Sequence, residues 1–187
     1  MEWLEGIYGE LRITRVNVHE YLGMKLDFRT TGEIWVTMVY YLKGVLEDLL
    51  EVTTGRSMIP AANNMFQVRP EDKRMLLNEE RATAFHHTVS QLVFVTSSAR
   101  NDIKMDVSFL CTRVRIPDED DSVNLVRVLR YIRGTLHLPL ILRDNSLSVL
   151  KWWVDAPFTT HPYFKENTGV MMSMVSVSIM ELSRNKQ

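Results

Sequence analysis

Asp155 is the residue whose position best suits metal-dependent chemistry. It lies in the apolar stretch Leu147–Phe158, which predicts a buried strand that presents one carboxylate at its exposed end. In nucleases that cleave phosphodiesters, several such carboxylates converge on a pair of Mg²⁺ ions. Beyond Asp155 the acidic residues are Glu166 and Glu181. Because one carboxylate cannot hold two ions, we expect no tight Mg²⁺ binding and no catalysis by this chain alone.

Three arginines, Arg127, Arg130 and Arg133, recur at helical spacing and could contact successive phosphates of a nucleic acid. The alternative is that they compensate the negative end of a helix dipole and are otherwise solvated. Neighbouring side chains on a helix point about 100° apart, so His86 and His87 cannot readily share a metal ion. We expect one of these histidines to be exposed and the other partly buried.

The composition is that of a globular protein in a reducing compartment. A single cysteine, Cys111, excludes an internal disulfide, and we expect it to be a small apolar residue of a helix rather than a nucleophile. The net charge of −1 leaves any attraction for nucleic acid to local patches. The longest apolar runs fall far short of the ~20 residues of a membrane helix, and the N-terminus lacks signal-peptide features. These features predict an intracellular protein, cytoplasmic or nuclear, with no membrane partner.

The N-terminal third predicts strands followed by a helix. Apolar and polar residues alternate over Val16–Phe28, which predicts one half-buried strand. Thr30–Gly32 is a plausible turn, and Glu33–Met38 would be the returning strand. Residues 42–49 follow helical spacing. Residues 51–78 show no period, and we interpret them as a long connection at a junction or on the surface.

Three helices are predicted next. The first covers Glu79–Val95, and the second begins near Asp102. The third has Pro117 in its first turn and Asp118–Asp121 at the positive end of its dipole, and it ends at Gly134. Its apolar stripe consists of Leu125, Val128, Leu129 and Ile132.

After the helices the pattern returns to strands. Residues 138–143 predict one strand, residues 144–146 a turn, and the stretch with Asp155 a second strand. A hairpin is expected over residues 169–184. Strands, then helices, then strands indicate an α+β fold.

Four stretches resemble the polyprotein of copia-type LTR retrotransposons, in that family's order and over nearly the whole chain. They are Val18–Asp27, Ala99–Ile103, Val128–Thr135, and Trp153–Ala156 with Asn167–Gly169. The resemblance is to the C-terminal part of the reverse transcriptase and the beginning of its ribonuclease H domain. It implies a palm-derived β-hairpin and following helix in residues 1–60 and thumb- or connection-like helices in 61–137. It also implies the first strands of a truncated ribonuclease H-like β-sheet in 138–187.

The resemblance also implies roles for individual residues. Tyr21, Leu22, Gly23 and Met24 resemble the palm hairpin that grips the primer strand, where a glycine allows close approach to nucleic acid. The helices within 79–133 resemble the region that cradles template–primer, which brings the three arginines near the backbone of an RNA–DNA hybrid. Asp155 resembles the first metal-binding, catalytic carboxylate of ribonuclease H, here vestigial. Mg²⁺ and template–primer are the cofactor and partner of the intact family, and we expect weak, sequence-independent nucleic-acid binding here.

Several positions depart from the family pattern. The paired Asp-Asp of the polymerase site would lie upstream of Met1. Asn101 and Pro157 replace a proline and a small polar residue, and the loop Tyr163–Glu166 and the segment Val175–Val177 also differ. Such differences are typical of a decayed element.

The sequence therefore predicts a fragment of a retrotransposon polyprotein that is inactive without polyprotein segments lying outside it. One alternative is a non-enzymatic module, derived from the element, that binds nucleic acid or another protein. Another is an active nuclease that receives its missing acids from elsewhere, for example through a dimer.

Overall fold

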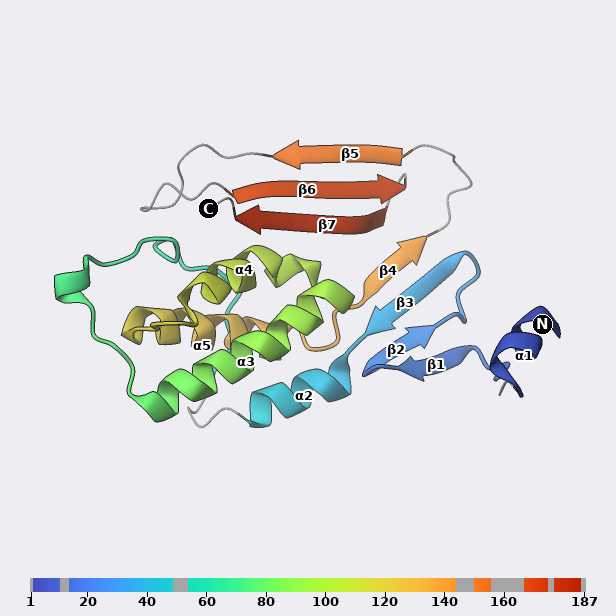
Figure 1. Ribbon diagram of the computed structural model, residues 1–187, viewed down its shortest axis with the longest axis horizontal. Helices are drawn as coiled ribbons and strands as arrows, with labels where there is room; N and C mark the ends of the chain where they lie inside the picture. The colour runs from blue at the N-terminus through green and yellow to red at the C-terminus, as the bar shows by residue number, and fades with distance from the viewer. Residues whose placement is uncertain are drawn as a thin grey trace.

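The computed structural model of the chain describes residues 2–10, 14–48, 54–143, 150–155, 167–174 and 177–185. Within them, helices lie beside two antiparallel sheets (Figure 1), which confirms the α+β class. The elements are α1 (Glu2–Tyr8), β1 (Val18–Tyr21), β2 (Met24–Asp27), β3 (Glu33–Thr37), α2 (Val39–Glu47), η1 (Glu71–Lys73), α3 (Glu79–Ser98), η2 (Asn101–Ile103), α4 (Lys104–Arg113), α5 (Glu119–Gly134), β4 (Leu140–Arg143), β5 (Leu150–Asp155), β6 (Asn167–Met174) and β7 (Val177–Asn185). Helix α1 was not predicted.

The stretch predicted as a single strand over Val16–Phe28 is a hairpin, so that prediction is wrong. Strands β1 and β2 pair antiparallel with Tyr21 opposite Met24, and Leu22 and Gly23 form the turn. The alternation of apolar and polar residues continues through the turn, which is why it did not reveal the reversal. Across the pair, Val18 lies opposite Asp27 and His19 opposite Leu26, so Val18 and Leu26 occupy different faces.

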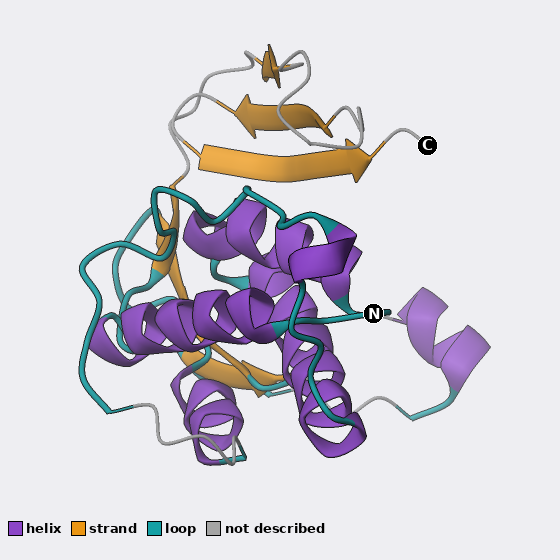
Figure 2. Ribbon diagram, turned by 90° about the vertical axis from the view of Figure 1, so that its left-hand side faces the viewer, coloured by secondary structure: helices purple, strands orange, loops and turns teal. Residues whose placement is uncertain are grey.

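The first sheet has the order β1-β2-β3-β4 and buries one face against the helices. Leu26, Val36 and Leu140 are register partners and belong to the hydrophobic core. Their neighbours Asp27 and Trp35 are partners on the opposite face. Helices α2, α3, α4 and α5 lie on one side of this sheet and α1 lies beyond β1 (Figure 1), and Figure 2 views the molecule from the side of those four helices.

The helices match their predicted apolar stripes closely. All four stripe residues of α5 are buried, and Ile103, Val107 and Leu110 are fully buried in η2 and α4. Helix α3 begins where predicted, capped by the Asn78 side chain, and ends three residues later than predicted, at Ser98. Helix α5 begins after its N-cap Asp118, so Pro117 precedes the helix.

The motif Ala99–Ile103 joins the end of α3 to the end of α5. Arg100 is 2% exposed, and its guanidinium donates two hydrogen bonds to the Asp102 carboxylate, each of 2.8 Å. It also donates to the carbonyl and the hydroxyl oxygen of Thr135, at 3.1 and 2.7 Å. Because every one of these bonds is internal, the described role of this motif is structural.

The described part of the long connection, residues 54–78, has mostly exposed side chains, as expected of a connection on the surface, and a few side chains attach it to the helices. Met65 is fully buried, and the ring of Phe66 meets that of Phe109 edge-on at a centroid distance of 5.2 Å. Arg69 and Arg74 pair with Asp120 and Asp118 at the start of α5. This segment has no periodic pattern because single side chains, rather than a repeating face, attach it.

The second sheet has the order β5-β6-β7 and is a meander of antiparallel strands. It contains the predicted Asp155 strand and the predicted hairpin, with an irregular register between Met172 and Ser173. Strand β4 pairs with β3 in the first sheet, although the sequence grouped residues 138–143 with the C-terminal strands. The domain limits themselves stay predictions.

Candidate nucleic-acid interface

A cleft of about 640 Å³ opens at the turn of the β1–β2 hairpin. It lies between the outer face of the first sheet and the exposed face of α2. Tyr21, Leu22, Gly23 and Met24, the four residues predicted to grip a primer strand, all line it. The structure therefore brings this predicted group together at the mouth of one concave surface.

The turn holds a strained leucine at the edge of this cleft. Leu22 has φ 48° and Gly23 has φ 75°. Two-residue hairpin turns with both central residues at positive φ suit the twist of the strands, but only glycine adopts this region without steric cost. Leu22 is also 61% exposed, so burial of its side chain does not offset the cost of this backbone conformation. Backbone strain of this kind clusters at functional sites.

Gly23 is favoured by its positive φ angle, and it lies close to Tyr41. A Cβ built at this position would lie 3.4 Å from Cδ2 of Tyr41, which lies behind the turn. The Tyr41 ring is held in turn by Phe94 of α3, edge-on at a centroid distance of 5.3 Å. The turn backbone therefore rests directly on a packed aromatic pair.

Exposed aromatic rings give the cleft surfaces on which bases could stack. Tyr21 and Tyr40 are 62% and 76% exposed, and Trp35 is 40% exposed. The Trp35 indole donates a 2.7 Å hydrogen bond to Glu33, which restricts its ring. Sequence reasoning missed Tyr40 and Trp35. The hairpin register places Trp35 on the outer face, but that register was not predicted.

The charges around the cleft largely balance. Lys25, Lys43 and His137 line it together with Glu20 and Asp27. Glu20 lies directly across the hairpin from Lys25. The hydrogen bonds that the Arg29 side chain donates to Asp27 lower the pKa of that carboxyl to about 2, so Asp27 stays ionised and paired. Two lysines and two carboxylates thus line the cleft, so any attraction for phosphates is modest.

The predicted arginine stripe lies elsewhere. Arg127 and Arg130 are half-buried and line a second, smaller cavity of about 230 Å³, together with Arg56, Asn64 and Gln67. Arg133 is exposed and is not among its lining residues. The structure thus separates the two groups of predicted nucleic-acid contacts and divides the stripe itself.

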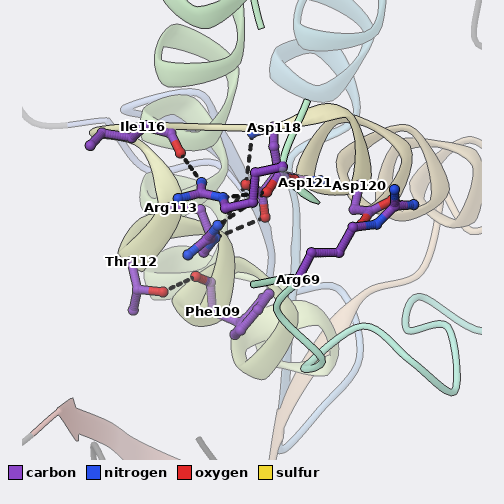
Figure 3. A network of polar contacts seen from close by, with 9 residues as sticks. Arg69, Phe109, Thr112, Arg113, Ile116, Asp118, Asp120 and Asp121 are labelled. Carbon is purple, nitrogen blue, oxygen red and sulfur yellow. Dashed lines mark hydrogen bonds and ion pairs between the residues drawn. The ribbon is translucent and has the colours of Figure 1, made fainter. Parts of the chain in front are cut away.

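A third polar group, at the start of α5, is fully internal (Figure 3). The Arg113 guanidinium lies 3.0 Å from Asp121 and 3.3 Å from Asp118. The two aspartates also form a capping box, in which each side chain accepts from the backbone amide of the other. The sequence assigned these acids to the helix dipole and missed the box, whose second member is an aspartate rather than the usual glutamate or glutamine.

The pKa values of the two aspartates shift in opposite directions. Desolvation raises the pKa of Asp118, but the Arg74 side chain and the Asp121 amide outweigh it, and the net pKa lies below its usual value. For Asp121 desolvation prevails and the pKa is raised. The pKa of Asp118 is the lower of the two because this carboxylate contacts both Arg74 and Arg113.

Asp155 is the last residue of β5, as predicted, and its backbone lies opposite Gly169. Its side chain and those of Glu166 and Glu181 lie outside the description, so its catalytic and metal-binding role stays a prediction. Pro157, Tyr163–Glu166 and Val175 also lie outside the described residues. Where side chains are described, no group of three or more His, Cys, Asp or Glu residues comes together as a metal site.

His86, His87 and Cys111 do not line the cleft. His86 and His87 are both exposed, so the expectation of one partly buried histidine is wrong. Cys111 is half-buried in α4, and this burial raises the pKa of its thiol, as suits a packing residue rather than a nucleophile.

Two known proteins are similar to this chain at low identity. One is the uncharacterized mitochondrial protein AtMg00810 of Arabidopsis thaliana, 23% identical over 179 residues, covering 91% of this chain and 68% of that protein. The other is the putative transposon Ty5-1 protein YCL074W of Saccharomyces cerevisiae, 23% identical over 169 residues, covering 90% of this chain and 54% of that protein. The chain thus spans about two thirds of the first relative and about half of the second. These similarities support a retrotransposon-derived protein.

No protein-family model and no solved structure matches the chain. Among the described helices, none combines the length and the apolar character needed to cross a membrane.

Proposed function

We propose that the chain is the C-terminal part of a copia-type reverse transcriptase with the start of its ribonuclease H domain, and that its hairpin cleft holds a strand of template–primer. In this proposal residues 1–60 are palm-derived, residues 61–137 correspond to thumb and connection, and residues 138–187 begin the ribonuclease H sheet. The order of the four resembling stretches and the similarity to a putative transposon protein support the assignment.

The observation that carries the binding role is the strained Leu22–Gly23 turn at the mouth of a cleft with exposed aromatic rings and lysines. Aromatic rings stack on bases of any sequence, and lysines contact phosphates without reading bases. Such a surface binds single strands and hybrids with little sequence preference.

The test is fluorescence anisotropy with an RNA–DNA hybrid and with unrelated single strands, all with 5′-hydroxyl ends. We expect a dissociation constant of roughly micromolar or weaker at physiological salt, the range of non-specific binding. Replacing both cleft lysines, Lys25→Gln with Lys43→Gln, should weaken binding severalfold and reduce the salt slope by about 2, because about two phosphate contacts are lost. The sequence of the probe should not matter.

The matched control is Lys73→Gln with Arg115→Gln, which removes the same charge from exposed positions that do not line the cleft. It should leave the affinity nearly unchanged. Equal losses in the cleft and control variants would mean that only net charge matters and that the cleft is not the binding surface. Tyr21→Ala separates stacking from charge, and we expect it to cost about 1–3 kcal/mol if a base stacks there.

Catalysis is a separate proposal. Asp155 and Mg²⁺ would belong to the ribonuclease H site of the intact family, and we expect no hybrid cleavage by this chain alone. Labelled hybrid with Mg²⁺ or Mn²⁺ tests this: cleavage that disappears in Asp155→Asn would contradict it.

A further inference from the structure

We propose that the cavity between α5 and the segment 54–68 is a binding site for a phosphate group that carries two negative charges. This proposal does not depend on the hairpin cleft. The ligand class is a free phosphate or a phosphate monoester, such as the phosphorylated end of a nucleic-acid strand.

The first observation is that three arginines line a small cavity with too little opposing charge. Arg127 and Arg130 come from one face of α5, and Arg56 comes from the connection before α3. Asp120 is the acidic residue in the lining, and it is already paired, with Arg69 Nη2 2.8 Å from its Oδ1. The lining therefore keeps a net positive charge after its internal pairing is counted.

The second observation is that both α5 arginines hold a buried donor with nothing to donate to. The Nε atoms of Arg127 and Arg130 are inaccessible to solvent and have no hydrogen-bond partner among the described residues. Buried polar groups are normally hydrogen-bonded, and an arginine cannot escape the cost by losing its proton. An anion in the cavity would meet the two half-buried guanidiniums, and its charge would offset the cost of their unpartnered Nε donors.

The third observation is that the cavity has the shape and the polar groups for a tetrahedral anion. Its volume of about 230 Å³ suits a phosphate with a few waters or a short ester group. Asn64 and Gln67 add neutral side-chain donors opposite the arginines. Arginine guanidiniums bind phosphate oxygens in bidentate geometry, which single lysines do not reproduce.

Arg56 and Gly134 lie next to each other at the end of α5. A Cβ built on Gly134 would be in ordinary van der Waals contact, 3.7 Å from both Cβ of Arg56 and the carbonyl oxygen of Ser57. Residues distant in the sequence are thus brought to one cavity, which is why the arginine stripe alone did not reveal it.

The first arm of the test uses inorganic phosphate and thermal unfolding. Millimolar phosphate should raise the Tm of the wild-type chain more than chloride of equal ionic strength does. Arg127→Gln with Arg130→Gln should lose this difference, whereas the control Lys73→Gln with Arg115→Gln should keep it. If the double arginine variant and the wild type respond equally to phosphate, the site does not exist.

The second arm compares short single strands with a 5′-phosphate and a 5′-hydroxyl end. We expect the phosphorylated strand to bind the wild-type chain at least severalfold more tightly, and this preference to vanish in the double arginine variant. Stabilisation by inorganic phosphate without a preference for the phosphorylated strand assigns the site to small free phosphates. Equal affinity for both ends, lost equally in the arginine variant, would overturn the dianion proposal in favour of a backbone phosphodiester.

Asn64→Asp tests the same site with both arginines in place, so the proposal stays testable if the double arginine variant does not fold. It places a carboxylate in the cavity and should raise the Tm in phosphate-free buffer while abolishing the phosphate response. A variant that keeps the full phosphate response would contradict the proposal. Failure of the hairpin-cleft test leaves all these outcomes unchanged, because the 5′-hydroxyl probes there do not supply a terminal phosphate.

Discussion

Two groups of arginines lie along α5, and their surroundings differ. At its start Arg113 and Arg74 meet two aspartates, and Arg113 is buried with a carboxylate on each side. Two to three turns further on, Arg127 and Arg130 hold buried Nε atoms with no partner among the described residues. The first group follows the general rule for protein interiors that buried charges are paired. The second departs from it, and such departures are expected where a ligand completes the set.

The largest expected effect comes from breaking the paired group. Arg113→Met should lower the free energy of unfolding by about 3–5 kcal/mol, because it leaves two adjacent aspartates buried without their shared cation. Urea denaturation at neutral pH measures this loss. A cost below about 1 kcal/mol would mean that Arg74 alone neutralises both acids, and the comparison between the groups would lose its basis.

Asp106 is a buried carboxyl that is not paired with an arginine among the described residues, and it provides a further comparison with the first group. A carboxyl group can avoid a buried charge by binding a proton, whereas an arginine cannot. Burial raises the pKa of Asp106 to about 6, with a smaller contribution from Asp102, although a backbone hydrogen bond opposes the shift. Since the folded pKa exceeds the unfolded one, the contribution of Asp106 to stability is present below about pH 4 and is lost as the pH rises through 6. At about 1.4 kcal/mol per unit, the loss by pH 7 is on the order of 2–3 kcal/mol.

Asp106→Asn should therefore have a flatter stability profile than the wild type between pH 4 and pH 7. Urea titrations at both pH values on both proteins isolate this residue, because the other titrating groups are common to the pair. Identical profiles would show that Asp106 is hydrated in the folded state and titrates normally.

The N-cap of α3 provides a reference for the N-terminus of α5, because its capping residue is neutral. Asn78 caps α3 through one side-chain hydrogen bond to the Arg81 amide, of 2.9 Å. Asn78→Ala should cost about 1 kcal/mol, the usual value for losing such a cap. If its effect in urea equals that of Arg113→Met, then α5 is held by its cap alone and the arginine pairing adds little.

The smallest effect is expected at the second group. Arg127→Met and Arg130→Met keep the apolar stem of each side chain and remove a donor that has no described partner, so stability should change by less than about 0.5 kcal/mol or rise. The measurement is urea denaturation in phosphate-free buffer. A loss as large as that of Arg113→Met would mean that these arginines are structural, and the two groups would no longer differ in kind.

Local patterns predicted the helices well because their signals lie within a few residues. The stripe of Leu125, Val128, Leu129 and Ile132 follows the helical repeat, and burial of that face needs no knowledge of its partner. The same reasoning failed at Val16–Phe28, where a two-residue turn reverses the chain without disturbing the alternation. It said less about residues 54–78, where single contacts such as that of Phe66 with Phe109 attach a segment without a repeat.

The candidate site divides in the same way. The resemblance pointed to Tyr21, Leu22, Gly23 and Met24, and all four line one cleft, but Trp35 and Tyr40 join them through strand register and the packing of α2. Arg127 and Arg130 were recognisable from their spacing, whereas Arg56, Asn64 and Gln67 approach them only in the folded chain.

The sequence by itself determined the α+β class, the apolar faces of the helices and the position of Asp155 at a strand end, because each depends on the repeat of a single element. Tertiary structure decided which arginines contact a carboxylate and which line a cavity. Charge pairing depends on distances of a few ångströms between residues far apart in the chain, and only the packing of the core against α5 sets those distances.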